Sequence, residues 1–214
     1  MRRLAAAMIA AAAIFNTAIL NTMPAMAQQP QMAGLYGTLG GGWLVPRDYD
    51  GSGAFDEVKT YNGYGVFAGA GYRLGAGLRA EAELGYGNVE NDRVTRSGIG
   101  TTEVGGDIDM YSVTGALYYD LPLDLAAKPY IGGGAGLMHQ RNSRPAVTIG
   151  GQTLPAGDDT TDLTAFGEVG LSYRIAADIE LVPSYRYQWI DDGRHGLDDT
   201  GMHVARIGLR YAFN

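Results

Sequence analysis

The chain has 214 residues, with 23 acidic residues against 16 Lys and Arg, a net charge of −7 and no cysteine. The acidic balance argues against nucleic acid as a partner, because phosphates are bound by basic surfaces, and the lack of cysteine excludes a disulfide scaffold. Its 33 glycines do not follow the Gly-X-Y period, which excludes a collagen-like fibre.

The start of the chain has the pattern of a secretory signal peptide. Residues 1–3 are basic, residues 4–20 are rich in Ala and Ile, and Ala-Met-Ala at 25–27 supplies a small-x-small cleavage site. A retained membrane anchor is disfavoured, because Asn16 and Thr17 interrupt the apolar run. Cleavage would leave 14 basic residues against 23 acidic ones, a charge of −9. We expect a cleaved signal at 1–27, a short N-terminal segment at 28–33 and one domain at 34–214.

After this segment the chain divides into eight stretches in which apolar and polar residues alternate. Alternation with a period of two places the apolar set on one face of a β-strand and the polar set on the other. Each stretch is near the roughly 9–11 residues that a tilted strand needs to cross a bilayer, whereas no stretch approaches the roughly 20 apolar residues of a spanning helix. The predicted strands are 35–45, 63–74, 78–88, 108–121, 129–140, 163–175, 179–190 and 202–213.

The connections between these strands are alternately long and short. An up-and-down transmembrane barrel has this asymmetry, with brief periplasmic turns and longer external loops. The sequence therefore predicts an all-β fold, an eight-stranded antiparallel up-and-down transmembrane β-barrel. A soluble barrel or sandwich is the alternative, but it gives aromatic residues no reason to gather at strand ends. The predicted long connections are 46–62, 89–107, 141–162 and 191–201.

Aromatic residues stand at both ends of the apolar faces. If the first strand runs outward, they form two girdles, as expected at the two interfaces of a membrane. The outer girdle would contain Trp43, Tyr64, Tyr86, Tyr111 and Trp189, and the inner girdle Tyr72, Tyr119, Tyr173, Tyr211 and Phe213.

The opposite faces carry charged residues of both signs, which we expect to form a network of ion pairs in the lumen. Eight strands leave an interior just wide enough for side chains to fill, and buried charges are tolerated when they are paired. The alternative is a proton or ion pathway. The network would contain Arg73, Arg79, Glu81, Glu83, Glu168, Arg174, Glu180, Arg186, Arg206 and Arg210.

Glycine and proline give two further expectations. The lumen-side glycines Gly132, Gly134 and Gly136 are expected to make room for the long charged side chains. Pro183 falls in the middle of a strand and cannot donate a ladder hydrogen bond, so we expect a bulge or a missing bond there.

The last strand has a recognisable spacing of residue types. Its eight positions read polar, any residue, Gly, apolar, any residue, aromatic, any residue and aromatic. The five defined positions are occupied by Arg206, Gly208, Leu209, Tyr211 and Phe213. This strand resembles the C-terminal targeting and closing strand of bacterial outer-membrane β-barrels, although such barrels commonly end on the aromatic residue itself and this chain continues to Asn214.

A second stretch carries the same resemblance. Residues 128–137, KPYIGGGAGL, resemble the Pro-Tyr-x-Gly-x-Gly-x-Gly run that is common in such barrels. Over about 34–213 the chain resembles the superfamily that includes the OmpA-type transmembrane domain and small outer-membrane surface antigens. The resemblance implies a place in the bacterial outer membrane. It implies as partners outer-membrane lipid and lipopolysaccharide, the barrel-assembly machinery during insertion, and an unidentified extracellular ligand. It implies no cofactor and no single activity, since fold analogy does not give function.

Two candidate sites are weighed against simpler explanations. The first long connection partly matches a calcium loop, with Asp48, Asp50, Ser52, Gly53 and Asp56 in place. The twelfth position should supply a bidentate acid but is Lys59, so a solvated acidic loop and no metal site is expected.

The second candidate is an enzyme, because some barrels of this kind modify lipopolysaccharide acyl chains with His, Ser and an acid. No nucleophile motif frames either serine, so no enzyme is expected. We expect a structural or surface-interaction role, with a narrow gated channel or a lipopolysaccharide-modifying enzyme as the alternatives. The catalytic candidates are His139, His195, His203, Ser97, Ser143, Asp198 and Asp199. Asp198 and Asp199, together with Asp191 and Asp192, also make the final connection strongly acidic.

Overall fold

The computed structural model describes residues 34–47, 49–50, 57–96, 100–103, 105–191 and 200–213. The predicted signal peptide and N-terminal segment and Asn214 lie outside these residues, as do Ser97, His195, Asp198 and Asp199. The calcium-loop candidates likewise have no described side chains.

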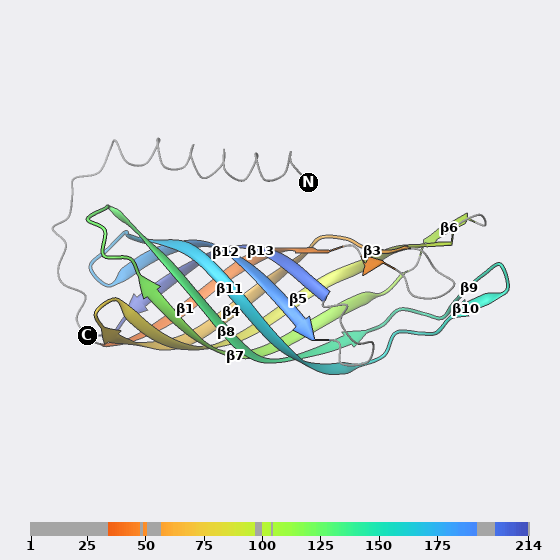
Figure 1. The fold of residues 1–214 in the computed structure, drawn as a ribbon, viewed down its shortest axis with the longest axis horizontal. Coiled ribbons are helices and arrows are strands. Elements are labelled where there is room, and N and C mark those ends of the chain that lie inside the picture. The colour runs from red at the N-terminus through yellow and green to blue at the C-terminus, as the bar shows by residue number, and fades with distance from the viewer. Residues whose placement is uncertain are drawn as a thin grey trace.

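Eight long antiparallel strands close into a barrel (Figure 1). Each strand pairs with its neighbour along the chain, and the last pairs with the first, with Leu39 opposite Leu209. The predicted eight-stranded antiparallel barrel is therefore confirmed. No helix of the described residues is long and apolar enough to cross a membrane. The barrel strands are β1 (Gly34–Pro46), β4 (Gly63–Gly75), β5 (Leu78–Arg96), β7 (Asp107–Asp120), β8 (Ala127–Asn142), β11 (Thr160–Arg174), β12 (Ile179–Asp191) and β13 (Thr200–Ala212).

Alternation along the strands places apolar residues outside and charged residues inside. Leu39 and Leu209 on the outer face are 66% and 49% exposed, whereas Arg79 in the interior is 1% exposed. In water this arrangement would expose a continuous apolar belt while burying charges, which is the reverse of a soluble domain. In a bilayer it is the expected arrangement of a transmembrane barrel.

Within the described residues, the predicted long connections 46–62, 89–107 and 141–162 contain further strands. They either extend the barrel sheet or form a separate hairpin. Both features stand at the end of the barrel where the long connections lie, which we call the long-connection end (Figure 1). These strands were not predicted, because they lie outside the apolar belt, where no buried face imposes alternation and backbone pairing alone defines them. The added strands are β2 (Tyr49–Asp50), β3 (Glu57–Thr60) and β6 (Gly100–Glu103), which join the extension of β5, and the hairpin β9 (Val147–Ile149) with β10 (Gln152–Leu154).

Pro183 interrupts one ladder without changing its register. Between β11 and β12 the pairs Gly170 with Ser184 and Tyr173 with Leu181 are present, while those between them are missing. On its other side Pro183 is still paired with Ile207. The expected irregularity is thus a local gap in the ladder instead of a bulge, because the missing N–H removes a bond but does not add a residue.

Candidate functional site

The interior of the barrel gathers almost all of the predicted network. Nine of its ten members are buried, and Arg174 is half-buried. They come from β4, β5, β11, β12 and β13, because every second residue of these strands points inward. We describe the interior as two charged groups and one apolar group, stacked along the barrel axis.

Two arginines and two glutamates form a closed ring of ion pairs, which we call the outer ring. Arg186 contacts Glu83 at 2.7 Å and Glu168 at 2.8 Å. Arg206 contacts the same two carboxylates, at 2.5 Å and 2.8 Å. Each charge therefore faces two charges of the opposite sign, an arrangement that offsets the cost of removing four ions from water.

A second charged group, the inner cluster, lies toward the short-turn end. Glu180 accepts hydrogen bonds from Arg73 at 3.2 Å and from Arg210 at 2.8 Å. Arg79 forms an ion pair with Asp120 at 3.1 Å. Glu81, the remaining buried acid of the inner cluster, accepts a hydrogen bond from the hydroxyl of Thr38 at 3.2 Å.

Asp120 was missed by the sequence analysis. Its signal was available, because Asp120 follows Tyr119 on its strand and therefore has the inward phase. With it, the described interior holds five buried arginines and five buried acids, so the charges balance: Arg73, Arg79, Arg186, Arg206 and Arg210 against Glu81, Glu83, Asp120, Glu168 and Glu180.

Aromatic rings fill the space between the arginines. Arg186 lies 3.6 Å from the ring centroid of Phe166, and Arg206 lies 3.6 Å from that of Phe67. Tyr36, which is fully buried, has three guanidinium groups within 6 Å of its ring and accepts a hydrogen bond from Arg79 at 3.3 Å. These are cation–π contacts, which gain strength away from water. These buried rings were not predicted, because the sequence pattern indicated aromatic residues only at the membrane interfaces.

Gly132, Gly134 and Gly136 make room for rings and backbone, not for the charged side chains as expected. A Cβ at Gly132 would collide with the ring of Tyr118, and one at Gly134 would lie 2.8 Å from Phe166. A Cβ at Gly136 would collide with the carbonyl oxygen of Val113 on the neighbouring strand. The expectation was wrong because aromatic rings and the backbone of neighbouring strands occupy this space.

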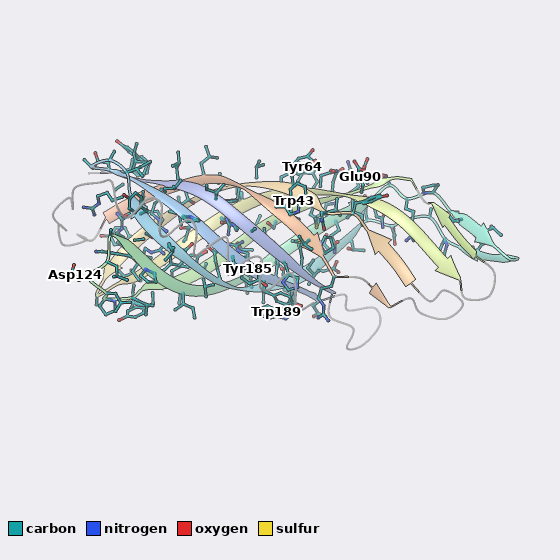
Figure 2. The ribbon with its side chains drawn as sticks, turned by 90° about the horizontal axis from the view of Figure 1, so that it is seen from above. Trp43, Tyr64, Glu90, Asp124, Tyr185 and Trp189 are labelled. Atoms are coloured by element: carbon teal, nitrogen blue, oxygen red, sulfur yellow. The ribbon has the colours of Figure 1, made fainter. Side chains whose placement is uncertain are left out.

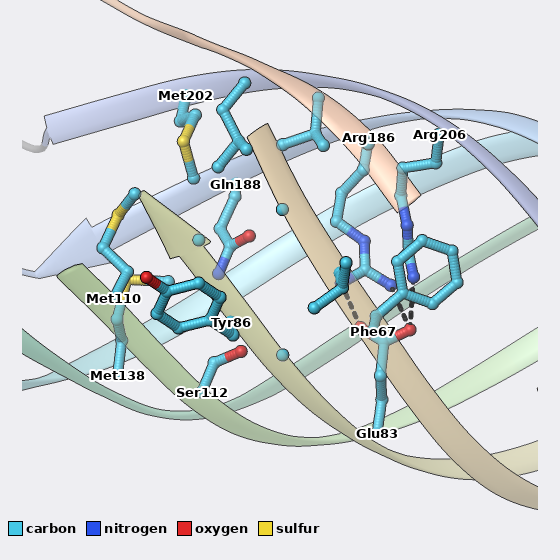
Figure 3. A pocket seen from close by; sticks show the side chains of 17 residues that line it. Phe67, Glu83, Tyr86, Met110, Ser112, Met138, Arg186, Gln188, Met202 and Arg206 are labelled. Atoms are coloured by element: carbon cyan, nitrogen blue, oxygen red, sulfur yellow. Dashed lines mark hydrogen bonds and ion pairs between the residues drawn. The ribbon is translucent and has the colours of Figure 1, made fainter. Parts of the chain in front are cut away.

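An apolar cluster, the apolar cap, occupies the interior at the long-connection end. A cavity of about 60 Å³ lies against it, lined by Met110, Met138 and Met202 and by Glu83 and Arg206 of the outer ring (Figure 3). A smaller cavity of about 30 Å³ on the inner-cluster side shares Glu83 and Arg206. Both could hold only a few water molecules. The apolar cap consists of Leu44, Val89, Met110, Met138, Ile190, Met202 and Val204.

The aromatic residues predicted for the girdles point outward. Figure 2 shows Trp43, Tyr64 and Trp189 on the outside of the barrel near its long-connection end. Eight of the ten are exposed by 37% or more, and Tyr86 and Tyr173 are half-buried. Tyr86 also donates a hydrogen bond to Asp109 at 2.8 Å.

One part of the outer rim carries hydrogen-bonding groups that the sequence analysis did not connect. Arg47, just after β1, donates a hydrogen bond to the hydroxyl of Tyr187 at 3.2 Å, and this contact raises the pKa of Arg47. The hydroxyl of Tyr185 and Nδ1 of His203 are 2.5 Å apart. The rings of His203, Tyr187 and Trp189 follow one another edge to face.

The described catalytic candidates do not come together. His203 meets two tyrosines, and His139 contacts the hydroxyl of Thr161 at 2.9 Å. Ser143 bonds instead to the backbone of Asp107. Within the described residues, no three or more His, Asp or Glu side chains come together as a metal site would need. Arg144, next to the β9–β10 hairpin, is not one of these candidates, and burial lowers the pKa of its guanidinium.

A family model described as the outer membrane protein beta-barrel domain matches residues 9–213. Among solved structures, the chain is similar to neisserial surface protein A, with a TM-score of 0.58 and 20% identity over 86% of this chain and 100% of that one. It is also similar to OprG of Pseudomonas aeruginosa, with a TM-score of 0.55 and 14% identity over 85% and 97% of the two chains. No curated protein sequence matches it. At these identities the solved structures show the shared fold.

Proposed function

This chain belongs to the outer-membrane β-barrel family and is located in the bacterial outer membrane, and from that premise we propose that it has a structural or surface-interaction role with a lumen closed to ions. We propose that its lipid-facing belt meets outer-membrane lipid and lipopolysaccharide, and that the barrel-assembly machinery binds its last strand during insertion. Specificity for an extracellular ligand would lie in the parts beyond the barrel, since loops and extensions on a rigid scaffold carry such contacts.

The observation that carries the closed lumen is the outer ring. Its four charges come from β5, β11, β12 and β13 and contact one another across the interior at 2.5–2.8 Å. Phe67 and Phe166 cover the two guanidinium groups. An ion that entered this layer would have to separate buried ion pairs, which is costly at low dielectric constant. It would also have to pass aromatic rings and methionines, which offer it few ligands in place of water.

The extension of the sheet supports the surface role. β5 continues well past the girdle level of Tyr86 and pairs with β3 and β6 outside the barrel. The hairpin β9–β10 stands apart from that extension (Figure 1). Within the described residues, β2, β6, β9 and β10 each pair along one edge, and the other edge is able to pair with an extended segment of another protein.

A gated channel is the second candidate, and one observation favours it. The two cavities lie on either side of a single layer and share Phe67, Glu83 and Arg206. Movement of that layer alone would join them. For catalysis we find no comparable support, and we propose that the protein is not an enzyme, because the described histidines and Ser143 have separate partners.

Ion flux into protein-loaded vesicles tests the proposal. Vesicles containing the protein and a potassium-sensitive dye should leak no faster than vesicles with an equal amount of an unrelated closed barrel. A matched sample of Glu83→Ala should leak measurably faster, because the outer ring then loses one of its two acids. Rapid leakage through the unaltered protein would instead support the channel.

A further inference from the structure

We propose that the rim strip, defined as Arg47, Tyr185, Tyr187, Trp189 and His203, binds a phosphate group of a lipopolysaccharide molecule in the outer leaflet. This inference rests on the proposed membrane role but not on whether the lumen is closed. It assigns to one side of the barrel a specific contact with a phosphorylated glycolipid.

The strip lies on the face that lipids cover. Tyr185, Tyr187 and Trp189 share the outward phase of β12, and His203 shares that of β13, opposite Tyr187. Trp189, which is 43% exposed, stands at the outer end of its strand (Figure 2). The strip is therefore at the level of the outer girdle, where headgroups and acyl chains meet.

Polar groups of this kind need a partner at that level. An arginine on the lipid face is costly in hydrocarbon and tolerated near the interface, where it reaches an anionic group or water. Arg47 carries five N–H donors, and its side-chain hydrogen bond to Tyr187 uses one of them. No described acid forms an ion pair with Arg47, in contrast to Arg141, which pairs with Asp159. With no acidic partner among the residues that the structure describes, its remaining donors suit the oxygens of a phosphate.

The position of the guanidinium is set by its surroundings. Arg47 donates its backbone N–H to the carbonyl oxygen of Gly201 at 3.0 Å, so the start of the connection is tied to β13. A Cβ at Gly201 would collide with the hydroxyl of Tyr187 and lie 3.2 Å from the side chain of Arg47. The glycine thus allows the side chain of Arg47 to reach the hydroxyl of Tyr187, whose ring packs against His203.

The rings below complete a binding surface for a lipid headgroup. His203 packs against Tyr187 with centroids 4.9 Å apart, and Tyr187 packs against Trp189 at 4.6 Å. Aromatic residues with a polar tip suit a contact that is apolar on one side and hydrated on the other. In the outer leaflet the anionic groups at this depth are those of the lipid headgroups, so we commit to a lipid-borne phosphate and not to a free ion.

Native mass spectrometry of the detergent-solubilised full-length protein tests this proposal, with bisphosphorylated lipid A and its dephosphorylated form as probes. The unaltered protein should retain the phosphorylated probe in clear preference to the other. Arg47→Gln should weaken that retention roughly tenfold, as expected for the loss of a charge-assisted contact. The matched control is Arg141→Gln, which removes an exposed arginine near the same end of the barrel and should leave retention unchanged.

A second variant and a competitor sharpen the outcome. Tyr187→Phe removes only the hydroxyl that positions Arg47 and should weaken retention by a smaller factor of about three. Equal retention of both probes, or equal loss in the Arg47 and Arg141 variants, would overturn the proposal. Displacement of the lipid by millimolar inorganic phosphate would also overturn it, in favour of a free-anion site. Vesicle leakage measured on the same samples reports separately on the proposed closed lumen.

Discussion

Replacing Glu83 with Gln tests how strongly the outer ring supports the barrel. The carboxylate accepts hydrogen bonds from Arg186 at 2.7 Å and 3.4 Å and from Arg206 at 2.5 Å. Breaking a buried ion pair costs about 3–5 kcal/mol, because the remaining charge stays buried without its partner. Glutamine keeps the shape and one acceptor, and Glu168 still contacts both arginines. We therefore expect the lower end of that range, a loss of about 3 kcal/mol.

Urea unfolding in lipid vesicles measures this loss. Tryptophan fluorescence and the mobility of unheated samples on gels would follow the same transition, and the free energy of unfolding would be compared with the unaltered protein. Asp159→Asn is the matched control, because its ion pair with Arg141 is 3.7 Å long with side chains 52% and 63% exposed. Such exposed pairs contribute about 0–1 kcal/mol. If Glu83→Gln costs no more than this control, the outer ring is not a buried, coupled network.

Three further variants, one of them with a matched control, test other parts of the structure by the same unfolding titration. Leu209→Arg places a charge on the lipid face and should destabilise the barrel by about 2–4 kcal/mol if it lies near the midplane; a neutral effect would mean that the faces are assigned wrongly. Gly136→Ala brings a methyl group against a backbone carbonyl of β7 and should cost about 1–3 kcal/mol, whereas Gly115→Ala, where nothing lies within 4 Å, should be near neutral. Tyr36→Phe removes the hydrogen bond from Arg79 and should cost about 1–3 kcal/mol; an unchanged stability would show that the tyrosine hydroxyl is not needed in the inner cluster.

The membrane-crossing part of the fold could be predicted because the bilayer imposes one rule on every strand. Outside, residues such as Leu39 and Leu209 must be apolar, and inside, residues such as Arg79 are free to be charged. This contrast produces a period of two that is legible in the sequence and sets strand number and phase. Beyond the girdles the rule ends, and β5 continues to Arg96 without it.

The contacts inside the barrel could be predicted only in kind. Charges of both signs at inward positions predicted ion pairs, but which arginine meets which acid depends on the stagger between strands that are distant in sequence. Glu83 and Arg206, for example, are 123 residues apart. Tyr36 and Phe166 had the inward phase too, but an aromatic residue in a membrane strand suggests an interface and not an arginine partner.

The rim strip could be predicted from the sequence only in part, for a different reason. Trp189 was predicted as a girdle residue from phase alone, and His203 was named only as a catalytic candidate. Arg47 lies just after a strand, where alternation says nothing about the direction of a side chain. Its contact with Tyr187 depends on the close approach allowed by Gly201, which is visible only in three dimensions.

Single-molecule conductance in a planar lipid bilayer tests the central claim most directly, that the outer ring and its aromatic neighbours close the lumen. The unaltered protein, inserted at neutral pH in concentrated potassium chloride, should give no discrete current steps above the bare membrane. Glu83→Ala, measured in parallel, should give brief openings because the outer ring is incomplete. Regular, long-lived current steps from the unaltered protein would contradict the account and support a channel.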